Sequence, residues 1–174
     1  CKYSAMLKKE LNKIAFKLYH IESSKLNGKL NKKIIPKNVD YIICFRSLFV
    51  LPKALIDKAK ITAVNFHPAP PEYPGSGCIN FALYDEVEEY GVTAHIMNEL
   101  VDNGAILEVR RFPVTPCDNL STVIRRTHSE LSNLCSDFIS GIYSFDAKFI
   151  EKKLKVSESE NWHGKARLLK ELDE

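Results

Sequence analysis

Three polar side chains in this sequence are of the types needed for electrostatic and acid–base catalysis. Asn65 and His67 stand two positions apart in the segment Asn65-Phe66-His67-Pro68, and Asp102 follows later in the chain. A side-chain amide can donate to a developing oxyanion, a histidine titrates near neutral pH, and a carboxylate can orient an imidazole and stabilise its charge. Taken singly, a His beside a Pro-rich loop is more often structural, and Asp-Asn-Gly is usually a turn.

The elements expected around these residues would bring them to one edge of a sheet. Residues 40–45 (DYIICF) and 61–67 (ITAVNFH) are predicted to be buried parallel strands, joined by a helix over 52–60. Such a unit is right-handed, and ligands bind beyond the carboxyl ends of its strands. Since alternate residues of a strand face the same side, Asn65 and His67 can point at one ligand atom.

The remaining elements complete an α/β fold with a mostly parallel central sheet flanked by helices. Further strands are predicted over 16–21, 91–97 and 105–114, helices over 4–14, 78–87 and 118–143, and an irregular Pro/Gly-rich loop over 68–77. The turn 98–104 carries Asp102. From residue 146 onward the sequence is charged and weakly periodic. We therefore expect a catalytic domain over residues 1–145 and a C-terminal tail over 146–174 that packs on it.

Motifs along most of the chain closely resemble the formyltransferases that use 10-formyltetrahydrofolate. That family closes a strand with Asn-x-His-Pro, continues through a Pro/Gly loop, and then shows Gly-Val-Thr and an Asp-x-Gly turn. The matching residues in this chain are Asn65, His67, Pro68, Gly75, Gly91, Val92, Thr93, Asp102 and Gly104. The resemblance extends from about Asn38 to Tyr143, with order and spacing kept, and implies a Rossmann-like catalytic domain.

The chemistry implied by the resemblance suits the three polar residues. Formyl transfer from folate N10 to an amine passes through a tetrahedral intermediate that carries an oxyanion. Asn65 could donate to that oxygen, His67 could supply charge or take a proton, and Asp102 could orient the imidazole or receive the proton through water. The implied co-substrate is 10-formyltetrahydrofolate, with no metal, because no spaced His/Cys cluster is present.

The resemblance also implies where the folate would bind. In the family the pterin is held largely by backbone groups of the loop after one strand and of the Asp turn, which correspond to 46–51 and 100–102 in this chain. The candidate folate-binding residues are Phe49, Val50, Leu51, Leu100 and Val101. Phe49 is equally well explained as a core residue at a strand–helix junction, and Leu51 less so, because pockets are themselves mostly apolar.

The sequence FHPAPPEYPG…NFALYDE…YGVTAH most resembles that of bacterial sugar N-formyltransferases, which act on nucleotide-linked amino sugars. The residues that flank the catalytic loop, and could contact the sugar or its diphosphate, are Tyr73, Ser76, Gly77 and Asn80. Ser76-Gly77 precedes a helix, whose free N–H groups suit an anion. Trp162 could stack on a base or fix the tail to the core. We interpret His95 as structural.

Composition indicates one ordinary globular domain. The 174 residues are 45% hydrophobic and 27% charged with a net charge of +3, which excludes a disordered chain. No apolar run approaches the ~20 residues that a bilayer span needs, and no signal peptide is evident. Five scattered cysteines without a CxxC pair argue against a disulfide framework and a zinc ribbon. We expect a cytoplasmic protein with reduced thiols and no membrane association.

The charge distribution favours small-molecule substrates over nucleic acid. Residues 1–60 hold 14 Lys+Arg against 4 Asp+Glu, but these lysines alternate with apolar residues at helical spacing, as on a solvated helix face. An anionic substrate drawn to this half is the second explanation. A homodimer is one option for the assembly.

The sequence differs from those of family members in two places. Family members begin with a strand and a Gly- or Ser-containing turn, whereas this sequence starts at Cys1, just after that strand. We therefore expect the N-terminal strand to be missing and an open sheet edge beside 40–45 or 16–21. The linker and second domain of methionyl-tRNA formyltransferases are not seen, so a tRNA acceptor is not expected. Glycinamide ribonucleotide as acceptor, and a catalytically silent folate or nucleotide-sugar binding module, remain the alternatives.

Overall fold

The computed structural model describes residues 2–15, 17–22, 36–47, 49–144 and 148–172. Its elements in chain order are α1 (Lys2–Ile14), β1 (Val39–Phe45), α2 (Lys53–Ile56), β2 (Ala59–His67), α3 (Cys78–Tyr84), β3 (Glu89–Ile96), β4 (Ile106–Pro113), α4 (Leu120–Tyr143), α5 (Phe149–Val156) and the 3-10 helix η1 (Leu169–Leu172). None of the described helices is both long and apolar enough to span a membrane.

The four described strands form one sheet in the order β1-β2-β3-β4. β1 and β2 are parallel and connected through α2, which confirms the expected α/β arrangement. We predicted a mostly parallel sheet, and β1 and β2 are its one parallel pair among the described strands. β3 runs antiparallel to both β2 and β4. The turn between β3 and β4 is too short for a crossover, and a direct turn can join only antiparallel neighbours.

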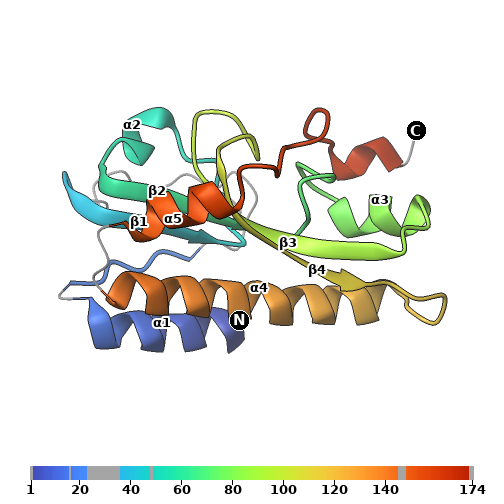
Figure 1. The fold of residues 1–174 in the computed structure, drawn as a ribbon, viewed down its shortest axis with the longest axis horizontal. Coiled ribbons are helices and arrows are strands. Elements are labelled where there is room, and N and C mark those ends of the chain that lie inside the picture. Colours follow the sequence, from blue (N-terminus) through green and yellow to red (C-terminus); the bar gives the residue numbers. More distant parts are fainter. Residues whose placement is uncertain (1, 16, 23–35, 48, 145–147, 173–174) are drawn as a thin grey trace.

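α1 and α4 cover one face of the sheet and enclose the main core (Figure 1). Residues of α4 three and four apart, from Leu131 to Ile139, pack with Leu7 of α1 on apolar side chains of β2 and β3. The Phe66 and Phe138 rings meet edge to face at 5.6 Å. α4 begins at Leu120, two residues after the predicted start at 118, because Asn119 is its N-cap and the Asn119 side chain accepts from the Thr122 N–H in a capping box.

Two predicted elements near the N-terminus differ in the structure. Residues 17–21, predicted to be part of a strand, form none, and residue 16 lies outside the described part of the chain. A strand exists by pairing, and no described strand pairs with this segment. The predicted helix 52–60 shrinks to one turn, because Ala59 already pairs with Val39 in the sheet.

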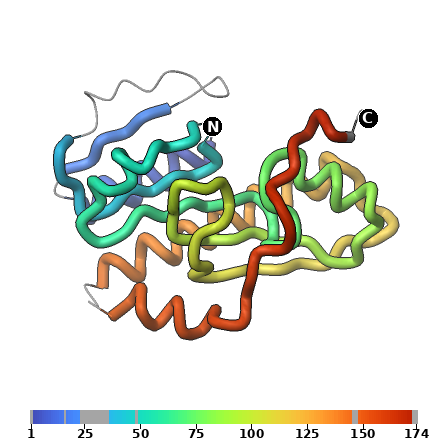
Figure 2. The backbone as a smooth tube through the Cα atoms, turned by 90° about the horizontal axis from the view of Figure 1, so that it is seen from above, coloured from blue at the N-terminus to red at the C-terminus, as the bar shows by residue number. Residues whose placement is uncertain are grey.

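β1 forms the end of the sheet, and no described strand pairs with its outer side, as predicted for the region beside 40–45. The other end strand, β4, is covered. α5 packs against β4, and the Ser157 hydroxyl donates to the Leu107 carbonyl at 2.8 Å. The tail therefore contains regular structure that its weak periodicity did not predict. After α5 it runs across the molecule toward the C-terminal end, drawn in red in Figure 2.

Phe138→Ala is expected to lower the free energy of unfolding by about 3–5 kcal/mol, because it leaves a cavity against Phe66 in the main core. Urea unfolding followed by circular dichroism measures the change. Tyr84→Ala, at a side chain that is 79% exposed, is the matched control and should change stability by less than ~0.5 kcal/mol. Equal losses in the two variants would mean that this core is placed wrongly.

Candidate active site

The structure brings Asn65, His67 and Asp102 together, as predicted. Asn65 and His67 close β2, and Asp102 lies in the turn that follows β3. The Asn65 amide donates to Asp102 Oδ1 at 3.4 Å, and His67 Nδ1 lies 3.3 Å from Asp102 Oδ2. One carboxylate thus contacts both predicted partners, one on each oxygen.

His95 is a fourth member of this cluster, so our structural interpretation of it missed a residue of the site. It stands opposite Asn65 in the antiparallel register of β2 and β3. His95 Nε2 lies 3.1 Å from the Asn65 amide nitrogen and 3.4 Å from Asp102 Oδ1. His95 Nδ1 donates to the Ile96 carbonyl at 3.0 Å, so the ring is held at both nitrogens. The Asn65 amide and one oxygen of Asp102 thus meet at His95 Nε2.

The backbone of the Asp102 turn is held in an uncommon conformation. Asp102 has a φ of +44°, in the left-handed region that Asp tolerates better than most residues. The Gly75 N–H donates to Asp102 Oδ2 at 2.9 Å. Gly104 has no room for a side chain, because a Cβ there would lie 1.7 Å from the Ile96 carbonyl oxygen. The Asp-x-Gly motif thus fixes the direction of the carboxylate.

Side chains of β3 anchor the loop that follows His67. The Tyr90 hydroxyl donates to the Pro68 carbonyl at 3.0 Å, and the buried Thr93 hydroxyl donates to the Ala69 carbonyl at 2.8 Å. The loop then returns to the site, where His67 Nε2 donates to the Tyr73 carbonyl at 3.0 Å. Thr93 of the Gly-Val-Thr motif therefore holds the loop of residues 68–77 in place.

Burial and charge act against each other on His67, which is 3% exposed. Burial lowers its pKa, and the Asp102 carboxylate and the Tyr73 carbonyl oppose that shift in part. Both neighbours of the ring are acceptors, so the imidazolium satisfies both while the neutral ring satisfies only one. His67 is therefore neutral at rest and supported on both nitrogens once it takes a proton.

Asp102 stays ionised in the same environment. Burial raises its pKa, but the bond to His95, the nearby His67 and the Gly75 N–H together bring the pKa below its ordinary value. Ionised Asp102 accordingly stabilises the fold above about pH 4, and this contribution is lost as the pH falls through the folded-state pKa. The cluster thus combines a fixed negative charge with two imidazoles and an amide donor.

A family model described as formyl transferase matches residues 3–139 of the sequence. The chain belongs to the formyl transferase family. The methionyl-tRNA formyltransferase of Listeria welshimeri is 29% identical to it over 151 residues, which cover 84% of this chain and 48% of that protein. This formyl transferase chain therefore spans about half the length of the curated relative.

Three solved structures show the similarity of the fold. A protein of Mycobacterium tuberculosis proposed to be a sugar N-formyltransferase aligns with a TM-score of 0.66 and 22% identity, covering 83% of this chain and 65% of its own. PseJ from Anoxybacillus kamchatkensis was solved with a UDP-linked formamido sugar and tetrahydrofolate. It aligns with a TM-score of 0.59 and 23% identity, covering 74% of this chain and 64% of its own. The phosphoribosylglycinamide formyltransferase of Streptococcus pneumoniae aligns with a TM-score of 0.54 and 26% identity, covering 60% of this chain and 59% of its own.

The residues predicted to hold folate lie on two loops and divide by exposure. Leu51 is buried in a small core cluster, and Phe49 packs against that cluster, as the core interpretation of Phe49 expects. Val50, Leu100 and Val101 are 61%, 60% and 47% exposed. Met97, next to the Asp102 turn, packs on the same cluster as Phe49, so the two loops are neighbours. Three apolar side chains of this formyl transferase chain are thus available to a ligand.

The residues predicted for the acceptor are largely engaged within the chain. The Tyr73 hydroxyl donates to Asp85 at 3.0 Å. The Ser76 N–H donates to the Arg167 carbonyl, and the Ser76 hydroxyl accepts from the Leu169 N–H. Gly77 caps α3 and its carbonyl accepts from the Asn80 N–H. The tail thus occupies the polar groups of Ser76, and their role toward an acceptor stays a prediction.

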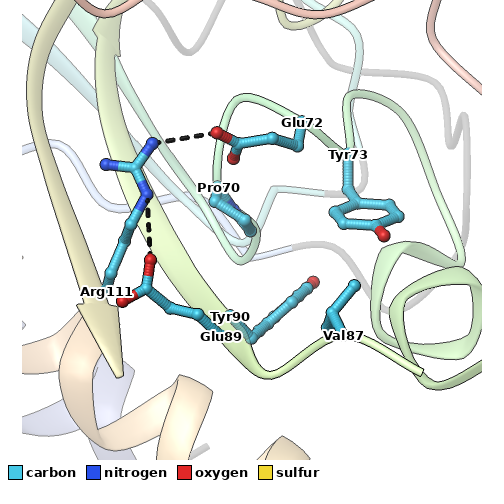
Figure 3. Close-up of a pocket in the computed structure, with 7 residues that line it drawn as sticks. All are labelled: Pro70, Glu72, Tyr73, Val87, Glu89, Tyr90 and Arg111. Atoms are coloured by element: carbon cyan, nitrogen blue, oxygen red, sulfur yellow. Dashed lines mark hydrogen bonds and ion pairs between the residues drawn. The ribbon is translucent and has the colours of Figure 1, made fainter. Parts of the chain in front are cut away.

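A pocket of about 250 Å³ lies beside the loop of residues 68–77. Figure 3 shows the side chains around it. It is lined by Pro70, Glu72, Tyr73, Val87, Glu89, Tyr90 and Arg111. Arg111 pairs with Glu72 at 2.9 Å and with Glu89 at 3.6 Å, so its charge is already compensated. Of the predicted site residues only Tyr73 lines this pocket, and the cluster around Asp102 lies outside it. Among the described residues, no group of three or more His, Cys, Asp and Glu could hold a metal ion.

Asp102→Asn is expected to lower the pKa of His67 further, because the substitution removes the carboxylate that favours the imidazolium and leaves the burial unchanged. Side-chain NMR of the histidines as a function of pH measures this pKa. Asp137→Asn, at an exposed carboxylate paired with Arg110, is the control and should leave His67 unchanged. An unchanged or higher pKa for His67 in Asp102→Asn would show that Asp102 does not stabilise the imidazolium.

Proposed function

We propose that this domain transfers a formyl group from N10-formyltetrahydrofolate to the primary amine of a nucleotide-linked amino sugar. The observation that carries the proposal is the buried cluster of Asn65, His67, His95 and Asp102 at the end of β2, in a chain of the formyl transferase family. Its parts are those that an acyl transfer between two nitrogens needs: an oxyanion donor, a proton acceptor and a fixed negative charge.

The reaction can be written with the residues of this cluster. The acceptor amine attacks the formyl carbon, the carbonyl oxygen becomes an oxyanion, and the Asn65 amide donates to it. His67 takes the proton that the amine loses, while Asp102 stays ionised and stabilises the imidazolium. The bond from the formyl carbon to N10 then breaks, and N10 takes up the proton that His67 holds, which returns the imidazole to its neutral form. The products are the formamide and tetrahydrofolate.

The folate would lie across the two neighbouring loops. The exposed apolar side chains of Val50, Leu100 and Val101 suit the flat faces of a pterin, and loop main chain suits its polar edge. Tyr73, Ser76, Gly77 and Asn80 remain the candidates for the acceptor side. The likeness of the fold to PseJ, whose structure holds a nucleotide sugar and tetrahydrofolate, supports this pair of substrates.

A tRNA acceptor is the second candidate, because the curated relatives include methionyl-tRNA formyltransferases at 29% identity. A screen with labelled formyl donor separates the candidates: UDP- and dTDP-linked amino sugars, glycinamide ribonucleotide and charged initiator tRNA are offered in parallel. Transfer to an amino sugar supports the proposal. Transfer to tRNA or glycinamide ribonucleotide alone overturns the acceptor, and folate binding without transfer to any of them favours a silent binding module.

Asp102→Asn is expected to reduce turnover at least ~100-fold while folate binding and the fold are kept, because the imidazolium of His67 loses its charged partner. Asn65→Ala should cost a similar factor by removing the oxyanion donor. Since the residues act as one unit, a variant with both substitutions and His67→Ala should be scarcely slower than the slowest single variant. Steady-state formyl transfer measures all of these, and near-normal turnover in Asp102→Asn would mean that the site is assigned wrongly.

A further inference from the structure

The C-terminal segment from residue 160 to residue 169 fastens the two loops that build the candidate active site. Figure 2 shows this segment, in red, crossing the molecule beside the loop of residues 68–77. It begins at Glu160, which pairs with Arg111 of β4, and ends where the Leu169 N–H donates to Ser76. No tail residue belongs to the motifs of the family, yet the tail touches both parts of the site.

Trp162 makes the contacts on the side of the Asp102 turn. Its indole N–H donates to the Gly104 carbonyl at 2.7 Å, two residues after Asp102. The indole ring also meets both histidines edge to face, with centroid distances of 4.9 Å to His95 and 5.8 Å to His67. One side chain thus ties the turn and covers the two imidazoles, which are almost fully buried.

Backbone bonds join the same segment to the catalytic loop. The His163 N–H donates to the Pro71 carbonyl and the Arg167 N–H to the Pro74 carbonyl, both at 3.0 Å. Gly75, whose N–H holds Asp102, has a φ of +102°, and a Cβ there would lie 2.1 Å from the Arg167 carbonyl oxygen. The glycine of the motif therefore has the tail directly against it, so the loop and the tail fit each other closely.

We propose that Trp162 is a positioning residue of the formyl transfer site, which holds the Asp102 turn through its N–H and keeps water away from His67 and His95 through its ring. The catalytic part of this assignment rests on the proposed function. It differs from stacking of the indole on a base of the acceptor, because the indole N–H already donates to Gly104 and the ring already contacts both imidazoles within the chain.

The environment of His67 makes the role of the ring measurable. The titratable groups that face His67 are Asp102 from the turn, His95 from β3 and the Cys78 thiol of α3, whose Sγ lies 3.8 Å from Nε2. Burial raises the pKa of Cys78 to about 12, so this thiol stays neutral. Removing the indole admits water to His67 and leaves Asp102 in place. The pKa of His67 should then rise toward or above its ordinary value of about 6.5.

Three variants of the whole chain test the proposal. Trp162→Ala should raise the pKa of His67 measured by NMR and lower kcat at least ~10-fold, with the KM values for folate and acceptor little changed. Trp162→Phe keeps a ring over the histidines but loses the N–H, so the pKa should stay near that of the parent while kcat falls roughly 3-fold to 10-fold. Leu168→Ala, at an exposed position of the same segment, is the control and should behave as the parent.

Each other outcome overturns the proposal. A raised KM for the acceptor with unchanged kcat and unchanged His67 pKa would assign Trp162 to substrate stacking. Loss of stability alone, with parental kcat per folded molecule and parental His67 pKa, would make it a simple tail anchor. If Trp162→Ala does not fold, Trp162→Phe decides: parental kcat in that variant contradicts the tie to Gly104. The NMR measurement needs no acceptor, so it separates failure of this proposal from failure of the proposed function.

Discussion

A carboxylate buried inside a protein must be paired, and the site of this protein is built around one such group. Asp102 is 7% exposed and contacts His67 and the Gly75 N–H through one oxygen, and Asn65 and His95 through the other. An unpaired charge at this depth would cost several kcal/mol. Moving any element that supplies a partner would therefore break a contact of this buried carboxylate and destabilise the fold.

The partners come from separate parts of the chain, which explains why the motifs of the family are spread along it. β2 supplies Asn65 and His67, β3 supplies His95, and the loop after β2 supplies the main-chain N–H of Gly75. The buried α4 core lies beneath β2 and β3 and fixes these strands. Motif residues that do not face the cluster, such as Thr93, hold the loops whose backbone groups take part. The geometry of the cluster and the local folding thus depend on the same hydrogen bonds.

Much of this arrangement could be predicted from the sequence, for reasons that differ between residues. A continuous apolar run ending in Asn65-x-His67 identifies a buried strand and the face on which both side chains lie, and this was confirmed. Placing Asp102 in the site needed the family motif, since an Asp-Asn-Gly turn alone has no preferred partner. His95 was missed because its role depends on the antiparallel register with Asn65, which hydrophobic periodicity does not encode.

The tail could not be predicted for a related reason. Trp162 reaches the site through single long-range contacts, to Gly104 and to the two imidazole rings, and such contacts leave no periodic pattern in the sequence. The predicted strand over 16–21 failed because strand formation depends on a partner. Local pattern thus predicted the elements that bury a continuous face, and it failed where a single distant contact decides the structure.

If the formyl group is transferred at the cluster around Asp102, folate must bind beside that cluster. The most direct test is an NMR titration of the protein with tetrahydrofolate, following the side-chain amide of Asn65 and the backbone amides of the loop 46–51 and the turn 98–104. We expect these signals to shift together with one dissociation constant. Shifts confined to the pocket lined by Tyr73 and Arg111, with an unperturbed Asn65 amide, would contradict transfer at this cluster.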